Sequence, residues 1–492
     1  MDAIKALVAY GMKHHLCEES DRIYICNQLA ELFHVTPSME LYDIPHTVQA
    51  LDEIFEPLFK HALKLNLMAD DSIDEKDRFE AKVMDLIVMR PSGLQKQFNK
   101  YYLQSPKEAT DYLYAWAKAS NYIKTGRLSK NIPLKVNTTY GDILGTINLA
   151  KPEKDARSII LEASKPDDFP LSPLSKEYVG LNLKGLPPRA NHRMIKLKLN
   201  QENFYFQYSP YVYYHQHAIV IHEDFIPMEI TEKTFKRLFD FVDQFPHYFL
   251  GSNAGLPIVG GSILSHEHYQ GGYTQFPIDD AQVLNQWQAN EVTVERLHWP
   301  LSLIRLRSQS KSAIEKMAIK FDQAWLQYSN DDFSIKAHTS DRHNAITPIA
   351  RKVKGEYILY IAFRNNRTSE AYPDGIFHPH KENQPIKKEN IGLIEVMGLG
   401  VLPGRLAIEL PIVLEVLQGD KPLNILSSSM QAWTESLKNS LPKNPQITWV
   451  QEEAMRTFVR GLEDCAVFGR HEKGIHTFEQ FIETTLKQKT TP

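Results

Sequence analysis

Cysteine is scarce in this sequence. Only three cysteines occur among 492 residues, Cys17, Cys26 and Cys465, and no two of them form a CxxC pair. Disulfide frameworks and thiolate zinc sites are built from sets of suitably spaced cysteines. The sequence therefore indicates neither a disulfide framework nor a zinc site made of thiolates.

The chain also lacks long hydrophobic runs and an excess of either charge. No apolar stretch approaches the roughly 18 residues of a membrane span, and the N-terminus, MDAIKALVAYGMKHHLCEESD, does not have the layout of a signal peptide. The net charge is −4, which gives no general attraction to nucleic acid or anionic membranes. We expect a soluble, cytoplasmic protein with neither nucleic acid nor a membrane as its partner.

The composition is that of a globular protein, and the length allows two or three domains. Residues 1–121 carry apolar residues at helical spacing in four segments that prolines separate, which predicts a helical N-terminal region. We interpret 122–155 as a connecting segment. Nothing in the helical region resembles a chemical site.

From residue 156 onward the sequence favours strands. Short β-branched and aromatic runs follow one another, among them SIILEAS, RMIKLKLN, NFYFQY and EYILYIAF. One helix is expected between them, over residues 230–245, with Thr231 as its N-cap. A later stretch, 343–380, repeats the order of strands and ends in another His-x-His. This predicts an α+β fold with two diverged halves, 156–300 and 301–405, and a mixed C-terminal region, 406–492.

One short stretch, GGSILSHEHYQGG at 260–272, stands out chemically. On a strand His266, His268 and Gln270 would share one face, because alternate side chains point to the same side. Two imidazoles and an amide can bind a metal, pack as satisfied polar groups, or handle a phosphoryl group. His215, His217 and His222 are available as further ligands, whereas the flanking glycines favour close approach to a phosphoryl group. Spacing alone does not choose between these readings.

The wider context resembles a known family. The sequence from strand through helix and SNAG turn to HxHxQ is similar to the histidine-triad superfamily, in its nucleotidyl-transferring branch. Further blocks resemble the second, mostly bacterial type of galactose-1-phosphate uridylyltransferase and extend the resemblance over essentially the whole chain. These blocks are NHRMIKL, FQYSPYVYY, HNAITPIAR, FRNNRTSE, GIFHPH and IKKENIGLIEVMGLGVLPGRL.

The resemblance implies a histidine-triad-like antiparallel sheet and a ping-pong exchange of UMP between UDP-glucose and galactose 1-phosphate, a step of the Leloir pathway of galactose metabolism. His268 would be the nucleophile that carries the uridylyl group, with its second ring nitrogen held by a backbone carbonyl such as that of His266. Gln270 would donate to the phosphoryl oxygens. A homodimer is also implied.

Substrate-binding residues follow from the matching blocks. Ser262 and Asn253 would contact the phosphate and the nucleotide, and Arg364 and Arg367 would suit a sugar phosphate, with surface salt bridges as the alternative. Uridine and sugar contacts fall, by block position only, on Asn191, Arg193, Gln207 and Tyr211.

One departure from the family concerns zinc. Members commonly hold a structural zinc with a CxxC pair, a histidine after the strand before the helix, and the first histidine of HxH. Here Ser172 and Ser175 stand in place of the cysteines and Phe225 in place of that histidine, so only His266 is left. A serine hydroxyl is a poor zinc ligand beside a thiolate. We therefore expect no metal and no cofactor.

Two further points stay open at the level of sequence. His378-Pro379-His380 lacks the glutamine and the glycine turn, and we interpret it as a structural counterpart of HxHxQ in the second half. A dinucleoside polyphosphate phosphorylase also uses HxHxQ, and a non-catalytic nucleotide-sugar binding protein is a further alternative. The flanking blocks and the intact His268 and Gln270 favour the uridylyltransferase.

Overall fold

A ten-stranded antiparallel sheet organises the chain in the computed structural model, which describes residues 1–149, 169, 172–261 and 263–488. The strands lie in the order β3-β4-β5-β7-β6-β11-β12-β10-β9-β8. Their bounds are β3 Ile195–Leu199, β4 Glu202–Tyr208, β5 Ala218–His222, β6 Phe249–Gly251, β7 His268–Gly272, β8 Val283–Ala289, β9 Val292–Leu297, β10 Leu303–Ser308, β11 Asn344–Val353 and β12 Glu356–Asn365.

The sheet consists of two five-stranded units with the same topology. In the first unit three strands, β3 to β5, are followed by helix α9 (Glu232–Gln244) and by β6 and β7, and β7 inserts between β5 and β6. In the second unit β8 to β10 are followed by α10 (Lys311–Gln327), and β12 inserts between β10 and β11 in the same way. The units join where β6 pairs with β11, with Gly251 opposite Ile349. The two diverged halves are thus confirmed.

The second unit begins earlier than the sequence indicated. Strands β8 and β9 precede residue 301 but belong to the second half of the sheet. The counterpart of β7 is β12, which contains no histidine, whereas His378 and His380 follow β12 in a loop. Our interpretation of His378-Pro379-His380 as the counterpart of HxHxQ was therefore wrong. The expected strand SIILEAS lies outside the described residues.

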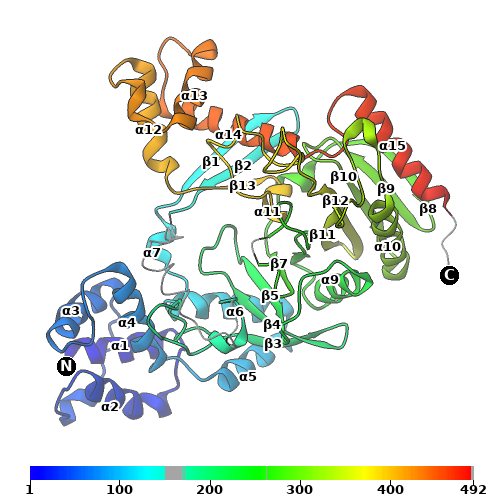
Figure 1. Cartoon of the computed structure of the whole chain (residues 1–492). Helices are drawn as coiled ribbons and strands as arrows, with labels where there is room; N and C mark the ends of the chain where they lie inside the picture. Colours follow the sequence, from blue (N-terminus) through cyan, green and yellow to red (C-terminus); the bar gives the residue numbers. More distant parts are fainter. Residues whose placement is uncertain (150–168, 170–171, 262, 489–492) are drawn as a thin grey trace.

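The N-terminal region is helical, as predicted, and Figure 1 shows α1 to α4 around the N-terminus at one end of the molecule, with α5 and α6 near β3 and β4. Ser72 and Ser105 cap α4 and α6 by accepting backbone N–H groups, and Pro91 and Pro106 occupy first turns. The bounds are α1 Asp2–Lys13, α2 Arg22–Leu32, α3 Leu51–Lys64, α4 Ile73–Asp85, α5 Pro91–Tyr102, α6 Pro106–Ala119 and α7 Thr125–Leu128.

A smaller sheet and the C-terminal helices complete the fold. Strands β1 (Ile132–Thr138) and β2 (Gly141–Ile147) form a hairpin that β13 (Leu399–Leu402) extends in parallel. The remaining helices are α11 Leu393–Val396, α12 Leu406–Gln418, α13 Ser428–Leu437, α14 Ile447–Asp464 and α15 Glu472–Lys487. Within the described part of the chain no helix is long and apolar enough to cross a membrane.

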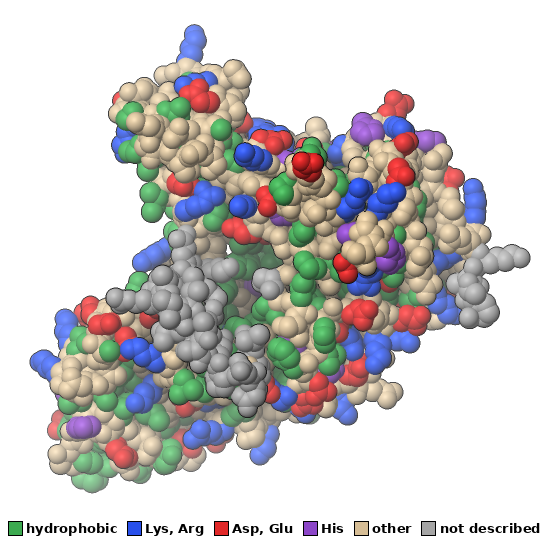
Figure 2. Space-filling model, in the orientation of Figure 1, with side chains coloured by type: hydrophobic (Ala, Val, Ile, Leu, Met, Phe, Trp, Pro, Cys, Tyr) green, Lys and Arg blue, Asp and Glu red, His purple; other side chains and the backbone are tan. Residues whose placement is uncertain are grey.

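The large sheet buries both of its faces. On one face Tyr269, Leu250 and Phe363 join a core with α9, α10 and the N-terminal helices, and on the other Ile349 and Tyr360 join a second core with Leu393 and the C-terminal helices. Figure 2 shows acidic and basic side chains interspersed over the visible face of the molecule, as the small net charge suggests.

Candidate active site

The HxHxQ stretch turns into a strand halfway along its length. His266 lies in a bend, and β7 begins at His268. His268 is opposite Ile221 of β5, and Gln270 is opposite Ile219, so the side chains of His268 and Gln270 share one face of the sheet. The expectation that all three residues project together from a strand is met by His268 and Gln270 but not by His266.

The intervening residues point to the opposite face and hold the strand against helix α9. Arg237 of α9 donates through Nη1 to Glu267 Oε1 (2.8 Å) and to the hydroxyl of Tyr269 (3.1 Å), and this hydroxyl donates to Glu267. All three side chains are buried. A buried charge that is paired and hydrogen-bonded is costly to disturb, so this triad fixes β7 from behind.

His268 is held in one tautomer. Its Nδ1–H donates to the carbonyl oxygen of His266 at 2.8 Å, as expected from the sequence, so the other ring nitrogen, Nε2, carries the lone pair. Only 5% of the side chain is exposed. Burial lowers the pKa of His268, although the hydrogen bond to His266 opposes the shift. The imidazole is therefore neutral at neutral pH, the form in which it acts as a nucleophile.

Gln270 contacts a third histidine. Nε2 of His217, a residue that directly precedes β5, lies 3.3 Å from Oε1 of Gln270. Burial lowers the pKa of His217 to about 3, so the ring is neutral. The sequence offered His217 only as an additional metal ligand; its contact with Gln270 depends on the pairing of β5 with β7 and could not be read from spacing.

The residues at the zinc positions of the family do not fit a zinc ion. The Phe225 ring lies against the His266 imidazole, with ring centroids 4.7 Å apart, and Nε2 of His266 is hydrogen-bonded to the carbonyl of His222 at 2.9 Å. A phenyl ring offers no ligand atom, and zinc prefers thiolate and imidazole. Among the described residues no group of three or more His, Cys, Asp or Glu side chains could hold a metal ion.

In the glycine-rich turn before β7, backbone atoms of the chain pack closely against a glycine. A Cβ at Gly260 would lie 2.0 Å from the carbonyl oxygen of Ala254, so only glycine fits there. Asn253 is buried, and its Oδ1 accepts the backbone N–H of Leu393 at 2.8 Å. The turn is thereby fastened to the start of α11. Ser262 lies outside the described residues.

Three of the four residues assigned by block position have structural partners. Arg193 gives all three guanidinium nitrogens to Asp85 and to the carbonyls of Met89, Ala190 and His192. Gln207 accepts from Arg189 and His192 and donates to Leu174, and Asn191 donates to the carbonyl of Ser120. These contacts favour structural roles.

Tyr211 is placed differently from the other three. It is half-buried, and its ring stacks beside that of Tyr213, which in turn stacks on His217 with ring centroids 5.2 Å apart. Tyr211 thus lies two ring contacts away from the His217–Gln270 pair.

The second unit contributes a buried arginine to the same face as His268. The pairs Gln270–Gly251, Gly251–Ile349 and Ile349–Tyr360 fix the parity of the sheet, and Arg364 lies four residues beyond Tyr360 on β12. Only 1% of its side chain is exposed, and its Nε and Nη1 have no hydrogen-bond partner within the part of the chain that the structure describes. Thr347, on the same face, has an unpartnered buried hydroxyl as well.

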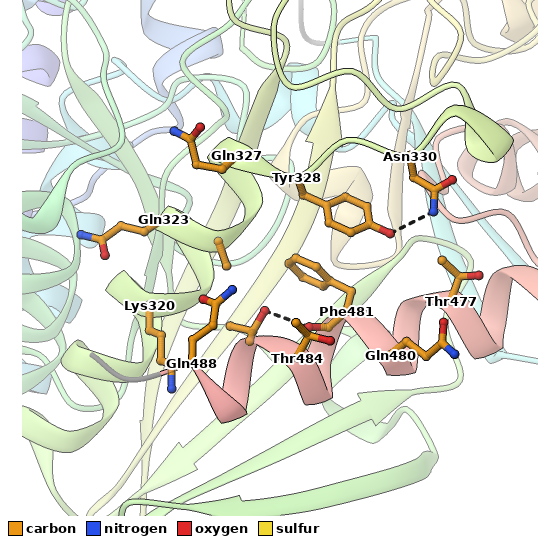
Figure 3. Close-up of a pocket in the computed structure, with 12 residues that line it drawn as sticks. Lys320, Gln323, Gln327, Tyr328, Asn330, Thr477, Gln480, Phe481, Thr484 and Gln488 are labelled. Carbon is orange, nitrogen blue, oxygen red and sulfur yellow. Dashed lines mark hydrogen bonds between the residues drawn. The ribbon is translucent and has the colours of Figure 1, made fainter. Parts of the chain in front are cut away.

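His378 is buried, and burial together with the charge of nearby Arg364 lowers its pKa, whereas Arg367 and His380 make contacts of their own. Arg367 is half-buried and donates to the carbonyl of Ser334, and His380 contacts Asp464. Figure 3 shows a hollow between α10 and α15, on the opposite face of the sheet from His268. It contains no predicted site residue and is lined by Lys320, Gln323, Ala324, Gln327, Tyr328, Asn330, Thr477, Gln480, Phe481, Thr484, Thr485 and Gln488.

Comparisons with known proteins agree with the sequence blocks. Residues 17–227 match the N-terminal domain of galactose-1-phosphate uridyl transferase, and residues 232–413 match its C-terminal domain. Two curated galactose-1-phosphate uridylyltransferases are similar over nearly their full lengths. The protein of Clostridium perfringens is 42% identical over 98% of both chains. That of Clostridium acetobutylicum is 43% identical over 97% of this chain and 98% of its own.

Two further comparisons are with a third relative in sequence and with a solved structure. The galactose-1-phosphate uridylyltransferase of Enterococcus faecalis is 42% identical over 94% of both chains. Among solved structures, yeast Ap4A phosphorylase Apa2 covers 64% of this chain and 91% of its own, with a TM-score of 0.35 and 10% identity, which is too low to bear on the function. Two domain matches and full-length identity above 40% establish that the chain belongs to the galactose-1-phosphate uridylyltransferase family.

Proposed function

We propose that the protein exchanges UMP between UDP-glucose and galactose 1-phosphate through a covalent uridylyl group on His268. Nε2 attacks the α-phosphorus of UDP-glucose, an N–P bond forms, and the P–O bond to glucose 1-phosphate breaks. A phosphate oxygen of galactose 1-phosphate then attacks the same phosphorus, releases the imidazole and gives UDP-galactose. Two displacements replace one difficult step.

The hydrogen bond from His268 Nδ1 to the His266 carbonyl is the observation that supports this mechanism most directly. It leaves the lone pair on Nε2, on the face that His268 shares with Gln270. The carbonyl also stabilises positive charge on the ring as the N–P bond forms, because the Nδ1–H becomes a stronger donor. His266 contributes through its backbone, and its ring serves packing.

One neutral side chain, Gln270, and one cationic side chain, Arg364, would bind the phosphates. Gln270 can donate its amide N–H groups to the phosphoryl oxygens where charge develops in the transition state. Arg364 is a buried cation whose Nε and Nη1 have no hydrogen-bond partner among the described residues, and a buried charge without full compensation costs several kcal/mol. The phosphate of galactose 1-phosphate would compensate that charge. Tyr211, and Asn253 with Ser262 in the glycine turn, stay candidates for the nucleotide.

Intact-protein mass spectrometry after incubation with UDP-glucose tests the covalent route. The wild-type protein should gain the mass of one uridylyl group and lose it when galactose 1-phosphate is added. His268→Ala should gain nothing, whereas His338→Ala, which changes an exposed histidine between α10 and β11, should still form the adduct. An active wild-type enzyme that never carries the adduct would rule the mechanism out.

We further propose that the protein works without zinc. The contact of Phe225 with His266 supports this, because a phenyl ring, which has no ligand atom, lies beside the one histidine left from the family's zinc ligands. Metal analysis of the purified protein should find zinc far below one equivalent per chain, and activity should persist after dialysis against a chelator. Stoichiometric zinc that resists dialysis would contradict the proposal.

The family resemblance also supports a homodimer and a cytoplasmic location as proposals. Light scattering on the purified protein should give twice the chain mass of 56.6 kDa. A mass of one chain at micromolar concentration would contradict the dimer, and fractionation of the cells that produce the protein would test the location.

A further inference from the structure

The contact between His217 and Gln270 gives an amide a fixed direction. A glutamine side chain presents an oxygen acceptor on one side and an NH₂ donor on the other, and the two ends exchange by a flip of the amide. Nε2 of His217 lies 3.3 Å from Oε1 of Gln270. If this nitrogen carries the hydrogen, the oxygen is engaged and the NH₂ group is left for a ligand.

The surroundings of His217 leave its ring little freedom. Its side chain is 3% exposed, and it lies between the rings of Tyr213 and Tyr214, with centroids 5.2 and 4.6 Å away. Nδ1 has no partner among the residues that the structure describes. One ring hydrogen is therefore sufficient, and it is used on Nε2 toward Gln270.

The residue before His217 is clamped by the N-terminal helical region. Gln216 adopts a φ of 55°, a left-handed conformation that costs energy for a residue other than glycine. Its Nε2 donates to Oδ1 of Asp111 on α6 at 2.7 Å, and its Oε1 accepts the hydroxyl of Tyr248. These two hydrogen bonds hold the two ends of the buried Gln216 amide. They stabilise the strained turn that fixes the position of the His217 ring relative to Gln270.

We propose that His217 is a positioning residue that orients the Gln270 amide toward the phosphoryl group, and that Asp111 holds His217 in place through Gln216. The inference rests on the proposed role of Gln270. It gives the N-terminal helices a task in catalysis: without the clamp, Gln270 could turn its oxygen toward the phosphoryl oxygens, where acceptor would face acceptor.

The protonation states support the geometry. Burial lowers the pKa of His217 to about 3, although the contact with Gln270 opposes this, so the ring stays neutral throughout the physiological range. Burial works against ionisation of Asp111, but hydrogen bonds from Lys107 and Gln216 lower its pKa below the usual value. The clamp is therefore an amide between a carboxylate and a hydroxyl, and His217 adds no titration to the pH profile of the enzyme.

A double-mutant cycle with kinetic readout tests the proposal. His217→Leu removes the donor and should slow transfer from UDP-glucose by roughly 10- to 100-fold at saturating substrate, with little change in KM. His217→Gln retains an N–H near the position of Nε2 and should restore most of the rate. In a Gln270→Ala background, His217→Leu should add no further loss, because its effect passes through Gln270.

Asp111→Leu should act in the same direction with a smaller loss, and that loss should also vanish in the Gln270→Ala background. Glu108→Gln, which alters an exposed carboxylate in the first turn of α6, is the matched control and should leave the rate unchanged. Circular dichroism and melting temperature would identify variants that fail to fold, and His217→Gln then carries the test.

Three results would overturn the inference: full turnover by His217→Leu, losses that multiply with those of Gln270→Ala, or a defect in His217→Gln as large as in His217→Leu. These outcomes are measured as turnover of UDP-glucose and galactose 1-phosphate, independently of any adduct. Failure of the covalent mechanism would appear instead as the absence of uridylyl-protein in the wild type.

Discussion

The two five-stranded units share their topology but differ in chemistry. The inserted strand of the first unit, β7, carries His268 and Gln270, whereas the inserted strand of the second, β12, carries no histidine and presents Arg364 instead. The side chains of His268, Gln270 and Arg364 lie on the same side of one continuous sheet. A duplicated framework thus brings the proposed nucleophile from one unit and a buried arginine from the other to a common face.

The covering helices differ in a parallel way. On α9, Arg237 is paired with Glu267 and bonded to Tyr269. On α10, Asp322 is 7% exposed, and burial raises its pKa to about 7, an effect that Arg342 only partly offsets. In the first unit the buried charge behind β7 is paired, while the second unit carries a buried acid that keeps its proton up to about neutral pH.

The largest expected effect separates the histidines of the two halves. His268→Ala should reduce turnover by at least about 10⁴-fold, because loss of a nucleophile removes the covalent route altogether. His338→Ala should retain most of the activity, since this exposed histidine of the second unit lies on the loop between α10 and β11. Coupled assays of UDP-galactose formation would measure both variants. Similar losses in the two would contradict the division of labour between the units.

The next effect concerns the pH dependence of stability caused by Asp322 on α10. Below about pH 4 Asp322 is protonated in both the folded and unfolded chain, and between about pH 4 and 7 only the folded chain keeps the proton. Stability contributed at this position therefore falls as the pH rises through this window. Asp322→Asn should raise the free energy of unfolding at pH 8 by up to about 4 kcal/mol, with little change at pH 4. Urea titrations at both pH values measure this, and equal gains would contradict it.

A smaller effect is expected for Arg364 in the second unit. Arg364→Met should raise KM for galactose 1-phosphate by about 10- to 100-fold, the size of a lost hydrogen bond to a charged group. The unliganded protein should be as stable as the wild type or more so, because the substitution removes a buried cation whose Nε and Nη1 lack hydrogen-bond partners among the described residues. An unchanged KM would exclude Arg364 as the phosphate ligand.

The smallest effect is expected at Arg367, which serves as the matched control for Arg364. It is half-buried and donates to the Ser334 carbonyl, so Arg367→Met should change KM for galactose 1-phosphate by no more than about twofold. Steady-state kinetics at varied galactose 1-phosphate would compare the two variants side by side. A larger rise in KM for Arg367→Met than for Arg364→Met would reverse their roles.

Much of the fold was predictable from local pattern. Thr231 precedes α9 as expected, its backbone N–H donating to Thr234 Oγ1. The predicted strand RMIKLKLN contains β3, and the predicted strands NFYFQY and EYILYIAF overlap most of β4 and β12. Capping and periodicity act within a few residues, so they are visible in sequence. The start of the second unit was not predicted, because β8 and β9 reveal their membership only through pairing, β8 with β9 and β9 with β10.

The candidate site was predictable in part. Asn191, Arg193 and Gln207 stand in blocks shared with the family, yet their hydrogen bonds go to Ser120, to Asp85 and to Leu174. A polar residue in a matching block can serve either substrate or structure, and only the location of its partners separates the two. Arg364 and Arg367 looked equivalent in sequence, and burial distinguishes them.

The sequence by itself determined the order of chemical groups along the chain: a histidine, a second histidine and a glutamine at alternate positions, with phenylalanine and serines where metal ligands would stand. Tertiary structure decided which of these groups meet. Strand pairing set His268 and Gln270 on one face, brought His217 to the amide, and aligned Arg364 with them from the second unit. Pairing and burial act between residues far apart in the chain, so local pattern does not contain them.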